Sequence, residues 1–282
     1  MTPGYRRRKL INAACFGLTA CCAAVGMGAL LFILGYIAWQ GAGAVRWSFL
    51  VNLPKPVGEP GGGIANAIVG SAKVVGLATL LGGPIGVLGG VYLAEFGQNR
   101  TGALVRYAAD LLNGVPSIVI GVFAYTLIVV PAKRFSALSG SVALALIMIP
   151  VVLRNTEEFV RLVPHTVREA ALALGIPQWK VILRVVLPTA APGVLTGVLL
   201  AMSRIAGETA PLIFTAFGNR FWDNGLLHPI ATLPHTIFTC AISPYKEWHQ
   251  QAWAAALVLM FFVLGVNVSA RLFLRPASGG ER

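Results

Sequence analysis

Two charged residues interrupt a long apolar stretch, and their types and spacing could bind an anion. Arg204 and Glu208 are four residues apart, so a helix through this stretch would place both on one face. The planar guanidinium of arginine binds phosphate-like oxyanions through paired hydrogen bonds. A nearby carboxylate repels a fully deprotonated anion but can accept a hydrogen bond from a protonated one, such as monohydrogen phosphate. The pair predicts an anion site in a transport pathway, or alternatively an ion pair that only stabilises the scaffold.

A third charge within an apolar stretch, Lys73, is a weaker candidate for the same pathway. Its flexible side chain could instead extend along the helix to the outer interface of a bilayer. The sequence favours this second interpretation, because Lys73 lies only about nine residues into its apolar segment.

Other residue patterns indicate neither a metal site nor a catalytic centre. The four cysteines form no Cys-x-x-Cys pair, and the four histidines have no His-Glu-x-x-His spacing. None of the six lysines follows a glycine, so the sequence lacks the phosphate-binding loop of ATPases. We therefore expect no metal or cofactor on this chain, and any ATP and Mg²⁺ chemistry must reside on a partner chain. An intramembrane enzyme using Glu208 with a histidine is disfavoured, because every histidine lies outside the expected spans.

The composition indicates a protein whose solvent is lipid. Hydrophobic residues make up 56% of the 282 residues and charged residues only 11%, less than half of the usual share in soluble domains. The mean hydropathy is +0.76. The net charge of +12 could indicate nucleic-acid binding, but no arginine-rich arm or basic aromatic strand accompanies it. A soluble enzyme, a disulfide scaffold and a nucleic-acid-binding protein are excluded.

Six segments are long and apolar enough to span a bilayer. We expect spans at residues 13–39, within 64–96, and at about 110–130, 135–153, 193–217 and 251–272. The first follows four basic residues, but its apolar run is too long for a cleaved signal peptide. Residues 64–272 would form the main body, flanked by a terminal segment at 1–12 and a tail at 273–282. In the second span Gly82, Gly86 and Gly90 predict close approach of another helix.

The distribution of lysine and arginine predicts the orientation. With residues 1–12 in the cytoplasm, fourteen of the 22 basic residues lie inside and six outside, while Lys73 and Arg204 lie within spans. Both termini are therefore expected in the cytoplasm. Residues 218–250 would form an outer segment whose apolar and aromatic content predicts a helix at the outer surface.

The cytoplasmic segment 154–192 is too long for a simple connection between helices. Thr166 and Glu169 have the spacing of a capping box, which would begin a short helix. Gly175 would end that helix in a left-handed turn. Pro177 would start a second helix, and Pro188 and Pro192 would close the segment. The pattern predicts a helix–turn–helix elbow, which is either a docking surface for another protein or a well-capped surface feature.

A family resemblance favours docking. Glu169-Ala170-Ala171, followed after three residues by Gly175 and after nine more by Val185-x-Leu187-Pro188, is similar to the EAA loop of ABC-importer permeases. The family usually has isoleucine where this chain has Val185. The resemblance covers most of the chain beyond residue 40 and is closest to the phosphate-specific permeases. The similar stretches are 63–70, 92–96, 114–119, 154–158, 203–212, Pro234 and 241–245.

The resemblance implies an all-α, six-span type I permease in the bacterial inner membrane. Glu169, Ala170, Ala171, Gly175 and Pro188 would then couple the chain to an ATPase. The expected partners are a second permease subunit, two ATPase subunits that carry ATP and Mg²⁺, and a phosphate-binding protein on the outside. The resemblance implies no enzymatic activity for the chain itself. Two rival functions are a permease for another oxyanion, such as sulfate or molybdate, and a channel that needs no ATPase.

Overall fold

The computed structural model describes residues 3–56, 58–59, 61–222 and 225–273, and within these ranges side chains are described at residue 4 and over residues 7–268. Within these residues every regular element is helical, apart from one isolated bridge between Phe217 and Ile230. The all-α architecture expected from the sequence is therefore confirmed. The expected tail at 273–282 lies almost wholly outside the described residues.

Five helical stretches are long and apolar enough to cross a membrane. They belong to α1 (Pro3–Ala42), α3 (Ala65–Glu95), α7 (Ala137–Arg161), the continuous stretch Gln178–Ala206, and α13 (Lys246–Phe273). A sixth crossing arises if one bent pair of helices is counted as a single span. Two of the expected spans, the third and the fifth, differ from these helices.

The expected third span at 110–130 is not one continuous helix, because it runs across a sharp bend. Helix α4 (Arg100–Gly114) ends before Pro116, and α5 (Ser117–Ala124) departs from it at 103°. Val115 is extended (ψ 131°), as expected for a residue that precedes proline. The second arm continues through the π-helical turn η1 (Tyr125–Val129) and α6 (Val130–Ala132).

The expected fifth span at 193–217 is also wrong at both ends. Helix α9 (Gln178–Val181), the π-helical turn η2 (Ile182–Val186) and α10 (Leu187–Ala206) form one uninterrupted stretch that begins earlier. This stretch ends at Ala206, and α11 (Ala210–Thr215) begins after a three-residue break. Gly207 lowers helical preference at the break, and Pro211 suits the first turn of the next helix.

The centre of the bundle is the packing of α3 against α7. Gly86 and Gly90 lie on a face of α3 that approaches α7 so closely that side chains could not fit. A Cβ atom on Gly86 would lie 2.7 Å from Cβ of Val152, and one on Gly90 would lie 2.6 Å from the Leu153 carbonyl oxygen. The small-residue spacing therefore packs two helices together, as in many membrane proteins.

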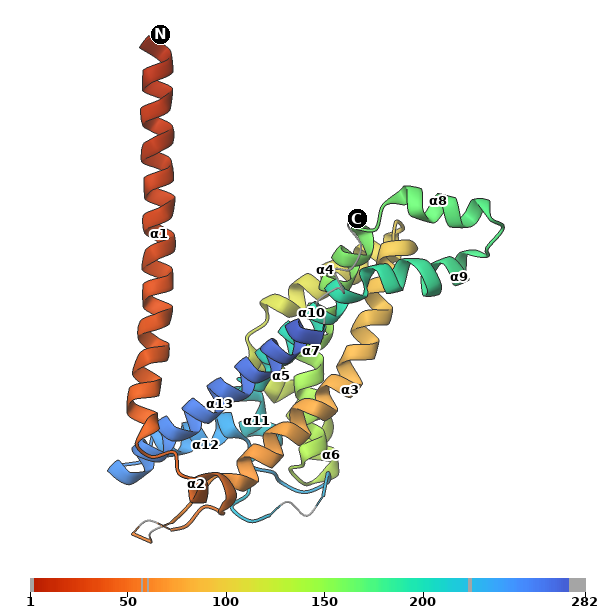
Figure 1. Cartoon of the computed structure of the whole chain (residues 1–282). Coiled ribbons are helices and arrows are strands. Elements are labelled where there is room, and N and C mark those ends of the chain that lie inside the picture. Colours follow the sequence, from red (N-terminus) through yellow and green to blue (C-terminus); the bar gives the residue numbers. More distant parts are fainter. Residues whose placement is uncertain (1–2, 57, 60, 223–224, 274–282) are drawn as a thin grey trace.

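Helix α1 stands apart from this bundle (Figure 1). It contacts α13 near its C-terminal end, where the Tyr36 ring meets the Trp253 ring edge-on at 5.3 Å between centroids. The start of α1 lies toward the same end of the molecule as α8 (His165–Ala173) and α9. At the opposite end lie α2 (Trp47–Val51), the start of α3 and the loop that precedes α12 (Leu233–Ala241).

Candidate functional site

The expected elbow is present as two short helices, α8 and α9, which project from the end of the bundle (Figure 1). Gly175 joins them with φ +74°, the left-handed conformation expected for it. The capping-box prediction was wrong. Pro164 occupies the N-cap position, so Thr166 already lies inside α8 and no side chain caps this helix.

The expected helix stops at Pro188 and Pro192 are also wrong, because the helix runs through both prolines. Pro188 has no N–H to donate to the preceding turn. The π-helical turn η2 directly precedes it and accommodates this loss by widening the helix locally. The hydroxyl of Thr189 donates to the Val185 carbonyl at 2.6 Å, which helps to satisfy the backbone there. The elbow is thus continuous with the long helix that ends at Ala206.

The predicted coupling residues divide into an exposed group and one buried residue. Glu169, Ala170, Gly175 and Pro188 are exposed in this chain. Ala171 is instead buried in the small apolar core that joins the elbow to the bundle. A helix that presents one exposed carboxylate among alanines leaves a shallow surface, which another protein could approach closely.

Arg168 attaches the elbow to the bundle, a role that sequence reasoning missed. Its Nη2 atom lies 2.8 Å from Oε1 of Glu95, the last residue of α3, and also donates to the Val160 carbonyl at 2.8 Å. Its Nη1 atom donates to the Val163 carbonyl. The side chains of Arg168 and Glu95 are only 13% and 8% exposed. A movement of α8 would therefore be transmitted directly to the end of α3.

A second charge cluster, also missed, joins α4 to α7 close to this attachment. Glu157 is only 2% exposed, and its carboxylate receives Arg106 Nε at 2.6 Å, Arg154 Nη1 at 2.9 Å and Arg161 Nη2 at 2.7 Å. Arg106 also donates to the carbonyls of Gly97 and Leu93. Three arginines around one buried carboxylate satisfy its lone pairs and fix the short helix α4 against the bundle.

The expected pairing of Arg204 with Glu208 does not form. Arg204 lies in the last turn of α10 and Glu208 in the break after it, so the two residues do not share a helical face. Within the described residues no ion pair joins them. Arg204 is exposed, whereas its neighbour Ile205 is buried among residues near the middle of α3 and α7, including Ala78 and Met148. The backbone at Arg204 therefore lies at about half the depth of the bundle.

Lys73 lies apart from this break, on an exposed position in the third turn of α3. The start of α3 is at the end of the molecule opposite the elbow. Lys73 therefore lies toward the end opposite the elbow, and the structure does not bring it together with Arg204.

Two interrupted helices, α5 and α11, meet close to the end of α10. Helix α5 follows the bend at Pro116, and α11 follows the break after Ala206. A Cβ atom on Gly121 of α5 would lie 2.7 Å from Cα of Pro211 in α11, so the two backbones are in direct contact. Broken helices at this depth leave polar backbone groups that must be satisfied inside protein or by water in a cavity. The break is therefore the best candidate for the lining of a pathway.

Comparison with known proteins agrees with this arrangement. Residues 86–276 match the family of binding-protein-dependent transport system inner membrane components. The chain is 46% identical over 272 residues to the phosphate transport system permease protein PstA of Xylella fastidiosa strain Temecula1, covering 96% of this chain and 94% of that protein. It is 43% identical over 269 residues to the PstA protein of Yersinia pestis, covering 95% and 90%.

A solved structure supports the fold alone. The MetNI methionine ABC transporter in inward-facing conformations aligns with a TM-score of 0.63 at 17% identity. The alignment covers 75% of this chain and 96% of that one.

Proposed function

This chain belongs to the family of binding-protein-dependent transport system inner membrane components, and we propose that it is the permease subunit of an ATP-driven importer of inorganic phosphate. The observation that carries the proposal is identity above 40% over nearly the whole chain to proteins named as phosphate transport permeases. The chain is a transport subunit rather than an enzyme, and its apolar helices make it a multi-pass inner-membrane protein.

The elbow supports a role in coupling to an ATPase. Its exposed side carries Glu169, Ala170 and Gly175, and its inner side is fixed to α3 through Arg168 and Glu95. An ATPase subunit docked on the exposed side could displace α8 and, through this ion pair, α3. ATP and Mg²⁺ would be bound by two such subunits, similar to PstB proteins, and not by this chain.

The exposure of Arg204 supports a second permease subunit. A guanidinium at half the depth of an apolar bundle is costly when it faces lipid. In this chain Arg204 is exposed, so a cavity or another protein must cover it in the membrane. A second permease, similar to PstC proteins, would place Arg204 in a pathway between the two chains. There its planar donors would bind a phosphate ion.

The orientation follows from the positive-inside bias together with the position of the elbow. The elbow and the start of α1 lie toward one end, which we propose is cytoplasmic. The opposite end would face a phosphate-binding protein, similar to PstS proteins, which delivers the substrate.

The test is phosphate uptake in a bacterium that lacks its own phosphate importers. We expect the chain, expressed with its three partner subunits, to restore uptake of radiolabelled phosphate. Unlabelled phosphate should compete, whereas sulfate and molybdate should not. Omitting the ATPase should abolish uptake. Uptake that persists without the ATPase would identify a channel, and competition by sulfate or molybdate equal to that of phosphate would identify a less selective oxyanion permease.

A further inference from the structure

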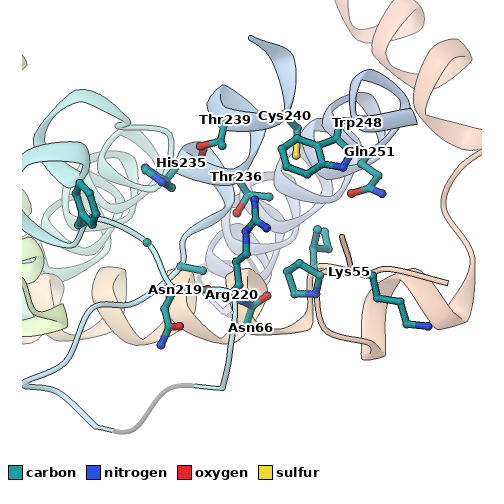
Figure 2. Close-up of a pocket in the computed structure, with 16 residues that line it drawn as sticks. Lys55, Asn66, Asn219, Arg220, His235, Thr236, Thr239, Cys240, Trp248 and Gln251 are labelled. Atoms are coloured by element: carbon teal, nitrogen blue, oxygen red, sulfur yellow. Dashed lines mark hydrogen bonds between the residues drawn. The ribbon is translucent and has the colours of Figure 1, made fainter. Parts of the chain in front are cut away.

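A half-open cavity of about 260 Å³, with a mostly apolar wall and several polar side chains, lies at the start of α3 and of α13 (Figure 2). This is the end of the molecule opposite the elbow. The start of α3, the segment before Arg220, helix α12 and the first turns of α13 enclose it. Its polar lining includes Asn66, Asn219, Arg220, His235, Thr236 and Thr239. No carboxylate is among the described residues that line it, and among these residues the charge of the lining is positive.

Arg220 supplies that charge. Figure 2 shows its side chain extending into the space between Asn66 and α12, whereas Lys55 points away. The guanidinium carbon lies 5.3 Å from the centroid of the Trp248 ring, which holds it by a cation–π contact. Within the described part of the chain Arg220 takes part in no ion pair. Its hydrogen-bond donors are available to an anion.

Asn66 supplies a buried acceptor that no group of the chain satisfies. The residue is only 4% exposed, and its Nδ2 atom donates to the Asn219 carbonyl at 2.6 Å. This bond fixes the amide so that Oδ1 must accept rather than donate. Within the described residues Oδ1 accepts no hydrogen bond, which is unusual for a buried polar atom. A ligand that carries an O–H group would satisfy it.

His235 adds a second unsatisfied acceptor or donor on the α12 side. Its Nδ1 atom is buried without a partner, and burial lowers the pKa of the ring, so His235 is neutral at pH 7. Gly218 keeps the wall open beside it. This residue has φ +81°, and a Cβ atom there would lie 2.8 Å from Nε2 of His235.

We infer that this cavity binds a singly protonated tetrahedral oxyanion, monohydrogen phosphate, on the outer side of the permease. The guanidinium of Arg220 would donate to the charged oxygens, and the hydroxyl of Thr236 could donate to another. Oδ1 of Asn66 would accept the hydrogen bond from the P–O–H group. Sulfate has the same shape and charge but no proton at neutral pH, so it would leave Oδ1 of Asn66 without a donor. The inference rests on the proposed function and adds an outer receiving site to it.

Direct binding tests the site. The full chain in lipid nanodiscs would be titrated with radiolabelled inorganic phosphate at pH 7.5, with sulfate as competitor. We expect Arg220→Gln to weaken binding about tenfold or more, as expected for loss of a charge-assisted hydrogen bond. Arg220→Lys should bind with intermediate affinity, because it keeps the charge but loses the planar fork. Arg46→Gln is the matched control, since Arg46 is exposed at the same end of the chain but does not line this cavity.

The outcome of that titration supports or contradicts the inferred phosphate site. Absence of binding by the unmutated chain, or equal binding by the unmutated chain and Arg220→Gln, would overturn the inference. Equally strong competition by sulfate would overturn the assignment of the Asn66 acceptor. Melting temperatures of all variants would be compared. If Arg220→Gln is unfolded, Arg220→Lys would carry the test, and binding by Arg220→Lys equal to that of the unmutated chain would overturn the inference.

Uptake by the assembled transporter separates this inference from the proposed function. If the unmutated complex imports phosphate and Arg220→Gln imports it equally well, the outer site is wrong while the proposed function stands. If the unmutated complex does not import phosphate, the proposed function is wrong, whatever the binding result. We expect import by the unmutated complex and at least a fivefold slower rate for Arg220→Gln at equal amounts of complex.

Discussion

The attachment of the elbow by Arg168 allows a quantitative prediction. The change is Arg168→Gln, which keeps a side chain able to donate one hydrogen bond but removes the ion pair with Glu95. The side chains of Arg168 and Glu95 are 13% and 8% exposed, so hydration compensates for little of the interaction energy that the substitution removes. Breaking a buried pair by removing one partner costs about 3–5 kcal/mol. Because glutamine can still donate to one carbonyl, we expect the free energy that holds the elbow to the bundle to fall by about 2–4 kcal/mol. The equilibrium between attached and detached elbow would then shift roughly 30- to 1000-fold toward the detached state.

The assay is hydrogen–deuterium exchange of the backbone amides in α8 and α9, measured on the chain in detergent or nanodiscs. We expect exchange across residues 165–181 to accelerate by a factor in that range, up to the limit set by local opening in the unmutated chain. Exchange in the central parts of α3 and α7 should not change, because their close packing at Gly86 and Gly90 does not involve Arg168. Arg184→Gln is the matched control, since Arg184 is exposed on the same segment and makes no ion pair within the described residues.

A double-mutant cycle with Glu95→Gln completes the experiment. The effect of Arg168→Gln should be smaller in the Glu95→Gln background than in the unmutated chain, because the pair is already broken. In the assembled transporter, Arg168→Gln should retain ATP hydrolysis while phosphate uptake falls. Unchanged exchange in α8, or additive effects of the two substitutions, would refute the claim that this ion pair attaches the elbow.

Three further predictions concern the remaining sites. Gly175→Val should destabilise the turn between α8 and α9 by about 1–2 kcal/mol, because φ of Gly175 is +74°, and it should reduce co-purification of the ATPase. Asparagine tolerates that φ, so a loss of co-purification in Gly175→Asn as well would indicate a steric clash at the docking surface rather than backbone strain. Arg204→Gln combined with Glu208→Gln should assemble yet import no phosphate, as measured by uptake per assembled complex; recovered uptake would place both residues in the scaffold. Burial lowers the pKa of His235 below its value in the unfolded chain, so protonation favours unfolding and the melting temperature should fall as the pH drops below about 6.5. A His235→Gln variant should lose much of that pH dependence. A pH profile of the melting temperature identical to that of the unmutated chain would contradict this prediction.

The elbow was predictable because its signals are local. The left-handed turn at Gly175 and the helix after Pro177 depend on neighbouring residues, so the sequence alone indicates them. The capping box failed for an equally local reason. Pro164 already has the extended backbone that an N-cap requires, and this places Thr166 at the second position of the helix.

The helix breaks were harder to predict because apolar composition continues through them. Hydropathy measures whether a segment enters lipid, and it does not register a change of direction. Pro116 and Pro211 were visible, yet a proline in an apolar run can also be accommodated within a helix, as Pro84 and Pro150 are. The pairing of Arg204 with Glu208 failed with the fifth span, because a spacing of four residues brings side chains together only within a helix.

The ion pairs that fix the elbow could not be predicted from one sequence. Glu95 and Arg168 are 73 residues apart, and only the packing of α3 against α7 brings them together. The same holds for Arg106 and Glu157. Glu95 and Glu157 both lie in stretches that resemble the permease family. That resemblance was the signal in the sequence that these glutamates have a role.

The close packing of α3 on α7 also has a mechanical consequence. The close approach of the backbones at Gly86 and Gly90 opposes sliding, so we expect the two helices to tilt together. The 31 residues of α3 give a rod of about 46 Å. A tilt of about 5° displaces one end by roughly 4 Å relative to the other, over the length set by a rise of 1.5 Å per residue. Glu95 at one end is tied to the elbow, and Asn66 at the other end lines the outer cavity. A small push on the elbow end can therefore change the width of the opening on the far side.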